Sequence, residues 1–68
     1  MSVYKVIEVI GTSGQSWEDA ASTAVAKARE TLRDLRVAEV VKQDLDIGED
    51  GSVTYRTKLS LSFKYESG

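Results

Sequence analysis

Residues 53–65 read Val-Thr-Tyr-Arg-Thr-Lys-Leu-Ser-Leu-Ser-Phe-Lys-Tyr and alternate strictly between two kinds of side chain. The odd-numbered positions, from Val53 to Tyr65, are mostly apolar, and the even-numbered positions carry hydroxyl or cationic groups. Successive side chains of a strand point to opposite faces of its sheet. The pattern therefore predicts one long strand with a buried face and a polar face.

The residues before this segment predict the other half of a hairpin. Val37 to Ile47 alternate less regularly, and the turn residues Gly48-Glu49-Asp50-Gly51 separate the two segments. We therefore expect two antiparallel strands joined by a short loop.

The register of this hairpin decides which side chains meet. If Ile47 pairs with Val53, Asp44 lies opposite Arg56. The two side chains are then placed to form a cross-strand ion pair.

The N-terminal half predicts a strand and a helix. Residues 4–10 are rich in β-branched side chains, and both faces of this strand are largely apolar. Residues 17–35 are helix-forming throughout, with Ser16 as a suitable N-cap and acidic residues in the first turn. The helix carries one apolar stripe, formed by Trp17, Ala20, Ala21, Ala24, Ala28, Leu32 and Leu35.

The predicted elements follow one another as β-α-β-β within a single domain, residues 1–68. Placing the last strand between the other two gives a fully antiparallel sheet with the helix on one face. We therefore predict an α+β fold. One helix covers only one face of the sheet, so we expect the other face to contact another subunit.

The composition excludes several classes of function. Nine Lys and Arg against eleven Asp and Glu give a formal net charge of −2, which argues against nucleic-acid binding. The chain has no Cys and no His, so disulfides, imidazole catalysis and Cys/His zinc sites are excluded. No apolar stretch approaches the ~20 residues that span a bilayer, and no signal-peptide pattern is present. We expect a cytoplasmic protein that contacts no membrane and is not an enzyme.

A chain of 68 residues is short for an independent fold. Ordering it costs on the order of 100 kcal/mol in conformational entropy, at roughly 1.5 kcal/mol per residue, which a single small core barely offsets. Because disulfides and zinc are excluded, oligomerisation is the remaining source of stability. We therefore expect a homo-oligomer.

The sequence resembles the dodecins over nearly its whole length. The resemblance lies in the first strand with its Gly-Thr-Ser end at residues 3–13, the Ala-rich helix ending in Ala28-Arg-Glu-Thr-Leu, Ala38-Glu39-Val40, Thr54-Tyr55-Arg56-Thr57 and Ser62-Phe63. It implies βαββ subunits that assemble as trimers of a hollow twelve-subunit shell. It also implies a non-enzymatic function in binding, storing or sequestering a small ligand.

Typical dodecins bind flavins between subunits. A tryptophan stacks on the isoalloxazine ring, and a glutamine contacts its edge. In this sequence Val37 occupies the tryptophan position and Arg56 the glutamine position. Valine has no aromatic face, and arginine donates hydrogen bonds but accepts none. The resemblance thus implies a flavin site at Val37 and Arg56 that has been lost or remodelled.

Carboxylates gather around the hairpin turn and suggest a different ligand. They are Asp44, Asp46, Glu49 and Asp50. Oxygen ligands suit a hard cation such as Ca²⁺, although the spacing is not that of an EF-hand loop. The alternative interpretation is a solvated acidic turn that keeps the assembly soluble. Glu8 and Glu39 are further candidate ligands, because a carboxylate in an otherwise apolar strand needs a partner.

A basic cluster is predicted on the last two strands, formed by Arg36, Lys42, Arg56, Lys58 and Lys64. It either binds an anion or forms salt bridges between subunits, with Glu18, Glu39 or Asp44 as partners. Trp17 has two interpretations as well. We favour a residue that packs the start of the helix over a ligand platform.

The sequence therefore leaves three functions open. The first is a dodecin-like shell that binds a small ligand through a remodelled flavin site. The second is a shell that binds a divalent cation such as calcium. The third is a purely structural assembly without a ligand.

Overall fold

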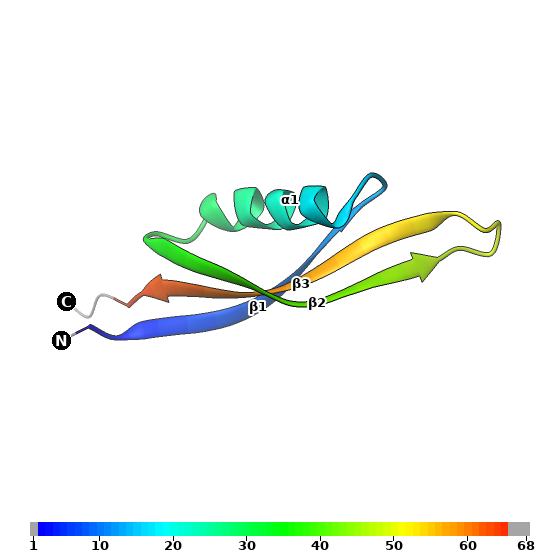
Figure 1. Ribbon diagram of the computed structural model, residues 1–68. Coiled ribbons are helices and arrows are strands. Elements are labelled where there is room, and N and C mark those ends of the chain that lie inside the picture. The colour runs from blue at the N-terminus through cyan, green and yellow to red at the C-terminus, as the bar shows by residue number, and fades with distance from the viewer. Residues whose placement is uncertain (1, 66–68) are drawn as a thin grey trace.

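The computed structural model describes residues 2–65 and contains four elements. They are β1 (Tyr4–Ser13), α1 (Trp17–Arg29), β2 (Leu35–Ile47) and β3 (Val53–Lys64). The strands form one antiparallel sheet in the order β1-β3-β2, and α1 lies across one face of it (Figure 1). The structure thus confirms the predicted β-α-β-β order and the central position of the last strand.

The β2–β3 hairpin has the predicted register. Ile47 pairs with Val53, and Asp44 pairs with Arg56. Gly51 lies in the turn with a φ of 86°, a conformation that glycine adopts without a steric penalty. The two strands extend well past the helix, so the turn projects from the rest of the subunit (Figure 1).

Two register shifts in β2 explain its irregular alternation. They lie between Leu35 and Val37 and between Val40 and Lys42, and each is typical of a β-bulge. A shift by one residue moves the following side chains to the other face of the sheet. As a result, even-numbered residues after the second bulge, such as Lys42 and Asp44, lie on the face away from α1.

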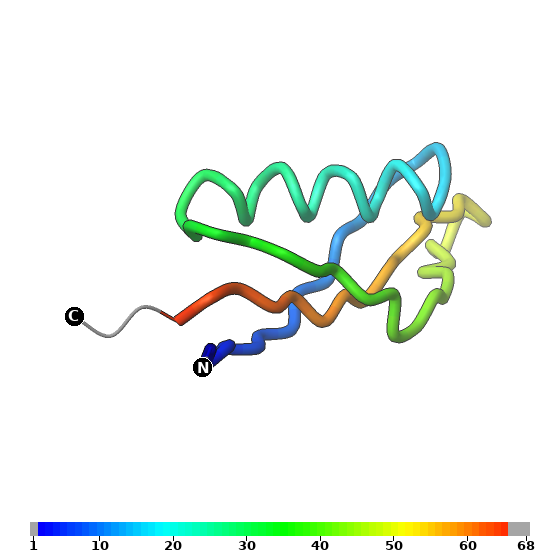
Figure 2. The backbone as a smooth tube through the Cα atoms, turned by 60° about the vertical axis from the view of Figure 1, so that its left-hand side comes forward, coloured from blue at the N-terminus to red at the C-terminus, as the bar shows by residue number. Residues whose placement is uncertain are grey.

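The core lies between α1 and the centre of the sheet. Leu59 and Leu61 of β3 are buried against Ala24 of the helix, and Ile7 and Val9 of β1 pack around them. Small residues on the helix allow this close approach. The tube in Figure 2 shows α1 on one side of the sheet and no element on the other.

The helix begins as predicted but ends early. The Ser16 hydroxyl accepts a hydrogen bond from the Asp19 N–H at 2.9 Å, as an N-cap does. The prediction that the helix extends to Leu35 is wrong, because α1 ends at Arg29 and Leu35 already belongs to β2. The chain must reverse here to bring β2 beside β3, and Asp34 adopts a φ of 56° in that reversal. In the described part of the chain, no helix is long and apolar enough to cross a membrane.

The sheet face opposite α1 keeps apolar side chains in contact with solvent in the isolated chain. Tyr4, Val6 and Ile10 of β1 are each about half exposed. We call this surface the helix-free face. Its exposure agrees with the expectation that a second subunit covers it, because one helix forms the only second layer over residues 2–65.

Candidate functional site

An ion pair between β2 and β3 marks the candidate site on the helix-free face. Arg56 donates from Nε to Asp44 Oδ1 at 2.7 Å and from Nη2 to Asp44 Oδ2 at 3.0 Å. Such a two-pronged contact is the strong geometry for a guanidinium and a carboxylate. The hydrogen bond from Arg56 lowers the pKa of Asp44, and the same contact raises the pKa of Arg56. The predicted cross-strand pair is therefore confirmed.

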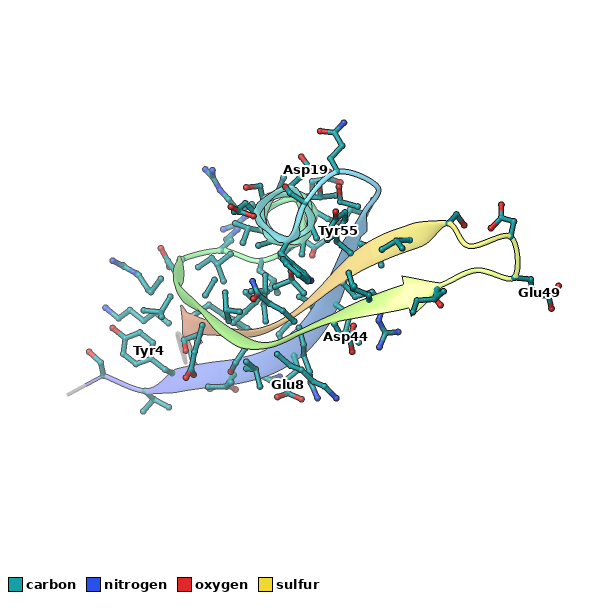
Figure 3. All side chains as sticks on the ribbon, turned by 45° about the vertical axis from the view of Figure 1, so that its right-hand side comes forward. Tyr4, Glu8, Asp19, Asp44, Glu49 and Tyr55 are labelled. Carbon is teal, nitrogen blue, oxygen red and sulfur yellow. The ribbon has the colours of Figure 1, made fainter. Side chains whose placement is uncertain are left out.

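Trp17 fixes the same strand from the opposite side. Its indole Nε1–H donates to the backbone carbonyl of Asp44 at 3.0 Å, and its ring meets Tyr55 edge-on at 5.1 Å. The hydroxyl of Thr57 donates to the Trp17 carbonyl at 3.0 Å. Figure 3 shows Tyr55 on the helix side of the sheet and Asp44 on the other side. These contacts confirm the interpretation of Trp17 as a packing residue, and they hold Asp44 by both its backbone and its side chain.

The ion pair of Asp44 with Arg56 predicts how the free energy of unfolding depends on pH. The folded-state pKa of Asp44 lies below its ordinary value of 3.8, so the unfolded state binds a proton first as pH falls. The contribution of Asp44 is present above pH ~4 and is lost as pH falls through the lower, folded-state pKa. We expect Asp44→Asn to reduce the free energy of unfolding modestly at pH 7, because both side chains are partly exposed. We also expect a flatter acid dependence.

Denaturant unfolding between pH 7 and pH 2 measures this effect. Asp46→Asn is the matched control, because Asp46 lies on the same face of β2 and forms no ion pair within 4.0 Å among residues 2–65. Equal pH profiles for the two variants would contradict the assignment.

A small cavity surrounds the ion pair and forms what we call the basic pocket. It has a volume of about 160 Å³ and is lined by Ile10, Lys42, Asp44, Arg56 and Lys58. Lys42 lies directly opposite Lys58 across the strands. Lys58 in turn contacts Glu8 of β1 at 3.4 Å. The predicted basic cluster is thus partly paired within one subunit, through Asp44 and Glu8.

The remaining members of the basic cluster lie elsewhere. Arg36 sits in the first bulge of β2, where it approaches Asp34 at 3.9 Å. Lys64 is at the far end of β3, opposite Tyr4. The register that places Asp44 opposite Arg56 also places Lys42 opposite Lys58, two residues further from the turn.

The two residues at the family flavin positions do not meet in one chain. Val37 pairs with Ser62, whereas Arg56 lies six residues earlier on β3. At about 3.3 Å per residue, the separation along the strand is ~20 Å. Both residues lie on the helix-free face, and Val37 is 57% exposed. A ligand that contacts both positions would have to lie between subunits.

The four carboxylates of the hairpin are also spread out. Asp44 is held by Arg56, and the Asp50 carboxylate accepts the Ser52 N–H at 3.0 Å, a contact that lowers the pKa of Asp50. Asp46 lies beside Asp44 on the helix-free face, and Glu49 lies in the turn (Figure 3). Among residues 2–65, no three acidic side chains gather closely enough to hold a metal ion. A calcium site would therefore need ligands from more than one subunit.

Glu8 and Glu39 share one row of the sheet. Both pair with Ser60, Glu8 from β1 and Glu39 from β2, so the three side chains lie side by side on the helix-free face. The sequence singled out both carboxylates but gave no reason to place them together. This row is a second place where carboxylate and hydroxyl oxygens lie near one another.

Comparison with known proteins defines the class to which this fold and site belong. The family model for dodecin matches residues 3–66. The calcium dodecin of Mycobacterium tuberculosis is 56% identical over 64 residues, which cover 94% of this chain and 90% of that protein. A dodecin of Thermus thermophilus is 42% identical over 64 residues, covering 94% and 93%. The chain belongs to the dodecin family.

A solved structure supports the same assignment. The crystal structure of the M. tuberculosis calcium dodecin superposes with a TM-score of 0.90 at 52% identity, covering 98% of this chain and 96% of that one. That protein is described as calcium chelating, with a novel calcium-binding site. The resemblance seen in the sequence is therefore confirmed, as is the dodecin-type ligand-binding class that it implied. Dodecins form dodecamers and bind small ligands.

Proposed function

We propose that this chain forms a cytoplasmic, non-enzymatic dodecamer whose ligand is calcium. The similarity to the calcium dodecin of M. tuberculosis supports this ligand. The observation from the chain itself is the charge at the projecting hairpin. Asp46 and Glu49 are exposed there, and neither forms an ion pair within 4.0 Å among the described residues. Carboxylate oxygens are among the ligands that Ca²⁺ prefers.

The hairpin site is proposed to be completed by assembly. Asp46 and Glu49 supply carboxylates that form no ion pair within 4.0 Å among residues 2–65, whereas Asp44 and Asp50 are held by Arg56 and the Ser52 N–H. Ca²⁺ takes six to eight oxygen ligands, more than one hairpin offers. A repeated subunit brings a second copy of each carboxylate, and water supplies the rest. The row formed by Glu8, Ser60 and Glu39 is the alternative location.

Geometry also weighs against flavin as the principal ligand. Val37 offers no ring for stacking, and Arg56 is engaged with Asp44 through two hydrogen bonds. Arg56 would have to leave Asp44 before it could contact a flavin edge. A shell without either ligand remains the structural alternative, and the experiment below separates all three.

We expect calcium to raise the stability of the protein. Ca²⁺ at a free concentration one hundred times its Kd should stabilise each site by about 2.7 kcal/mol, because it binds only the folded, assembled state. The measurement is thermal unfolding in Ca²⁺ and in EGTA at fixed protein concentration, with Mg²⁺ as the competing cation. Native mass spectrometry of the same samples gives the subunit number and the bound mass.

Two matched variants locate the site. Asp46→Asn combined with Glu49→Gln should abolish the calcium shift, whereas Glu18→Gln on α1 should leave it intact. Loss of the shift only in a Glu8→Gln, Glu39→Gln double variant would move the site to the Ser60 row. Absence of a calcium shift in the unmodified protein would contradict the proposal, and quenching of riboflavin fluorescence would then favour flavin.

A further inference from the structure

The basic pocket brings two lysines together beside a paired arginine. Three of its side chains are cations, and the single carboxylate, Asp44, has both oxygens bonded to Arg56. Glu8 contacts Lys58 from outside the pocket at 3.4 Å. Lys42 forms no ion pair within 4.0 Å among residues 2–65. We propose that this pocket binds a tetrahedral oxyanion, namely phosphate or a phosphate monoester, between Lys42 and Lys58.

The strand register is the strongest argument for an anion site in this pocket. Lys42 and Lys58 are direct cross-strand partners, and like charges in such a pair repel each other and destabilise a sheet. The hairpin turn sets this pairing, because the register that places Ile47 opposite Val53 also places Lys42 opposite Lys58. A bulge between Val40 and Lys42 follows directly. Bulges are frequent beside binding sites, where they redirect a side chain. An anion between the two ammonium groups replaces the repulsion with two attractive contacts.

The pocket also has the size and the donors that phosphate requires. Its volume of about 160 Å³ has room for roughly five waters at ~30 Å³ each. Each lysine ammonium offers three donors, and the recorded contacts of Arg56 with Asp44 use two of its five N–H groups. A phosphate monoester carries about −1.5 to −2 charges near neutral pH, so it attracts both lysines. Asp44 holds the guanidinium in place beside the two lysines.

This site is independent of the proposed calcium function. It binds a ligand of opposite charge, and it uses neither Asp46 nor Glu49. Its cations come from β2 and β3 of one subunit, so each chain carries a full set. In a homododecamer the site would be repeated once per subunit.

Calorimetric titration with inorganic phosphate tests the proposal on the assembled protein. The buffer contains EGTA, so that calcium cannot bridge phosphate to a carboxylate, and constant ionic strength removes the general effect of salt. We expect saturable binding. Lys42→Gln and Lys58→Gln should each weaken it about tenfold or more, because each removes a charge-assisted hydrogen bond. Lys27→Gln, on the exposed face of α1, is the control and should leave the affinity unchanged.

Further variants and a second anion distinguish a phosphate site from general charge attraction. Lys42→Arg should restore most of the affinity, and acetate should bind at least tenfold more weakly than phosphate. Unsaturable binding, or an effect of Lys27→Gln equal to that of Lys42→Gln, would mean that phosphate is attracted by general charge and not by the pocket. Either result would overturn the proposal. A third outcome is that the unmodified protein binds no phosphate and that Lys42→Gln loses its assembly in native mass spectrometry. A carboxylate of a second copy would then occupy the pocket instead of phosphate.

Discussion

Replacing Gly11 with alanine is expected to destabilise the subunit by about 3 kcal/mol, the upper end of the usual cost of overpacking. Gly11 is buried where β1 passes beneath α1. A Cβ atom there would overlap the carbonyl oxygen of Ala20 and lie 2.9 Å from the Cβ of Ala24. The first contact is with helix backbone, which cannot rotate away as a side chain can. Relief would require α1 to move off the sheet and expose Leu59 and Leu61.

Gly14→Ala is the matched control for this prediction. Gly14 lies three residues later in the connection to α1, and an added Cβ would meet no atom within 4 Å. We expect a change within ~0.5 kcal/mol, or a small gain in stability from a less flexible unfolded chain. Denaturant unfolding of both variants at one protein concentration makes the comparison, since the stability of an oligomer depends on concentration. Equal stability of the two would mean that α1 does not approach β1 as closely as described.

The sheet was predictable from the sequence because its pattern is local. Alternation in residues 53–65 and the glycines of the turn determine β3 and the hairpin, and Ile47 and Val53 then set the register. The end of the helix was not predictable in this way. Residues 30–35 include Leu32 and Leu35 at helical spacing, so local preference favours a longer helix. Tertiary structure overrides it, because Leu35 pairs with Phe63 in the sheet and packs against the core there.

The candidate site was likewise predictable only where it follows from local sequence pattern. The ion pair of Asp44 with Arg56 followed from the register and is confirmed. The opposition of Lys42 and Lys58 follows from the same register, whereas the pairing of the residues before Lys42 depends on the bulge at Val41. The calcium site involves a further difficulty. Its remaining ligands would come from other subunits, which neither the sequence nor the fold of one chain contains.

Replacing Leu61 with alanine is the second change with a large expected effect, about 2–5 kcal/mol of lost stability. Leu61 is fully buried at the centre of the sheet, between Ile7 of β1 and Ala38 of β2, and it contacts the helix near Ala24. Its core neighbours Ile7, Ala24 and Leu59 are held in place by β1, α1 and β3, so they cannot easily refill the cavity. Denaturant unfolding at fixed protein concentration measures the loss.

Ser62→Ala is the control, because Ser62 is the next residue of β3 but lies on the helix-free face. Its effect should be within ~0.5 kcal/mol. The comparison also bears on function, since both proposed ligand sites lie on the opposite face of the same sheet. Leu61→Ala weakens the support beneath that face without removing a ligand. If assembly precedes ligand binding, a partly assembled Leu61→Ala protein should recover its dodecamer on adding calcium, because a ligand of the assembled state stabilises that state. Stability of Leu61→Ala equal to that of Ser62→Ala would contradict a core centred on β3.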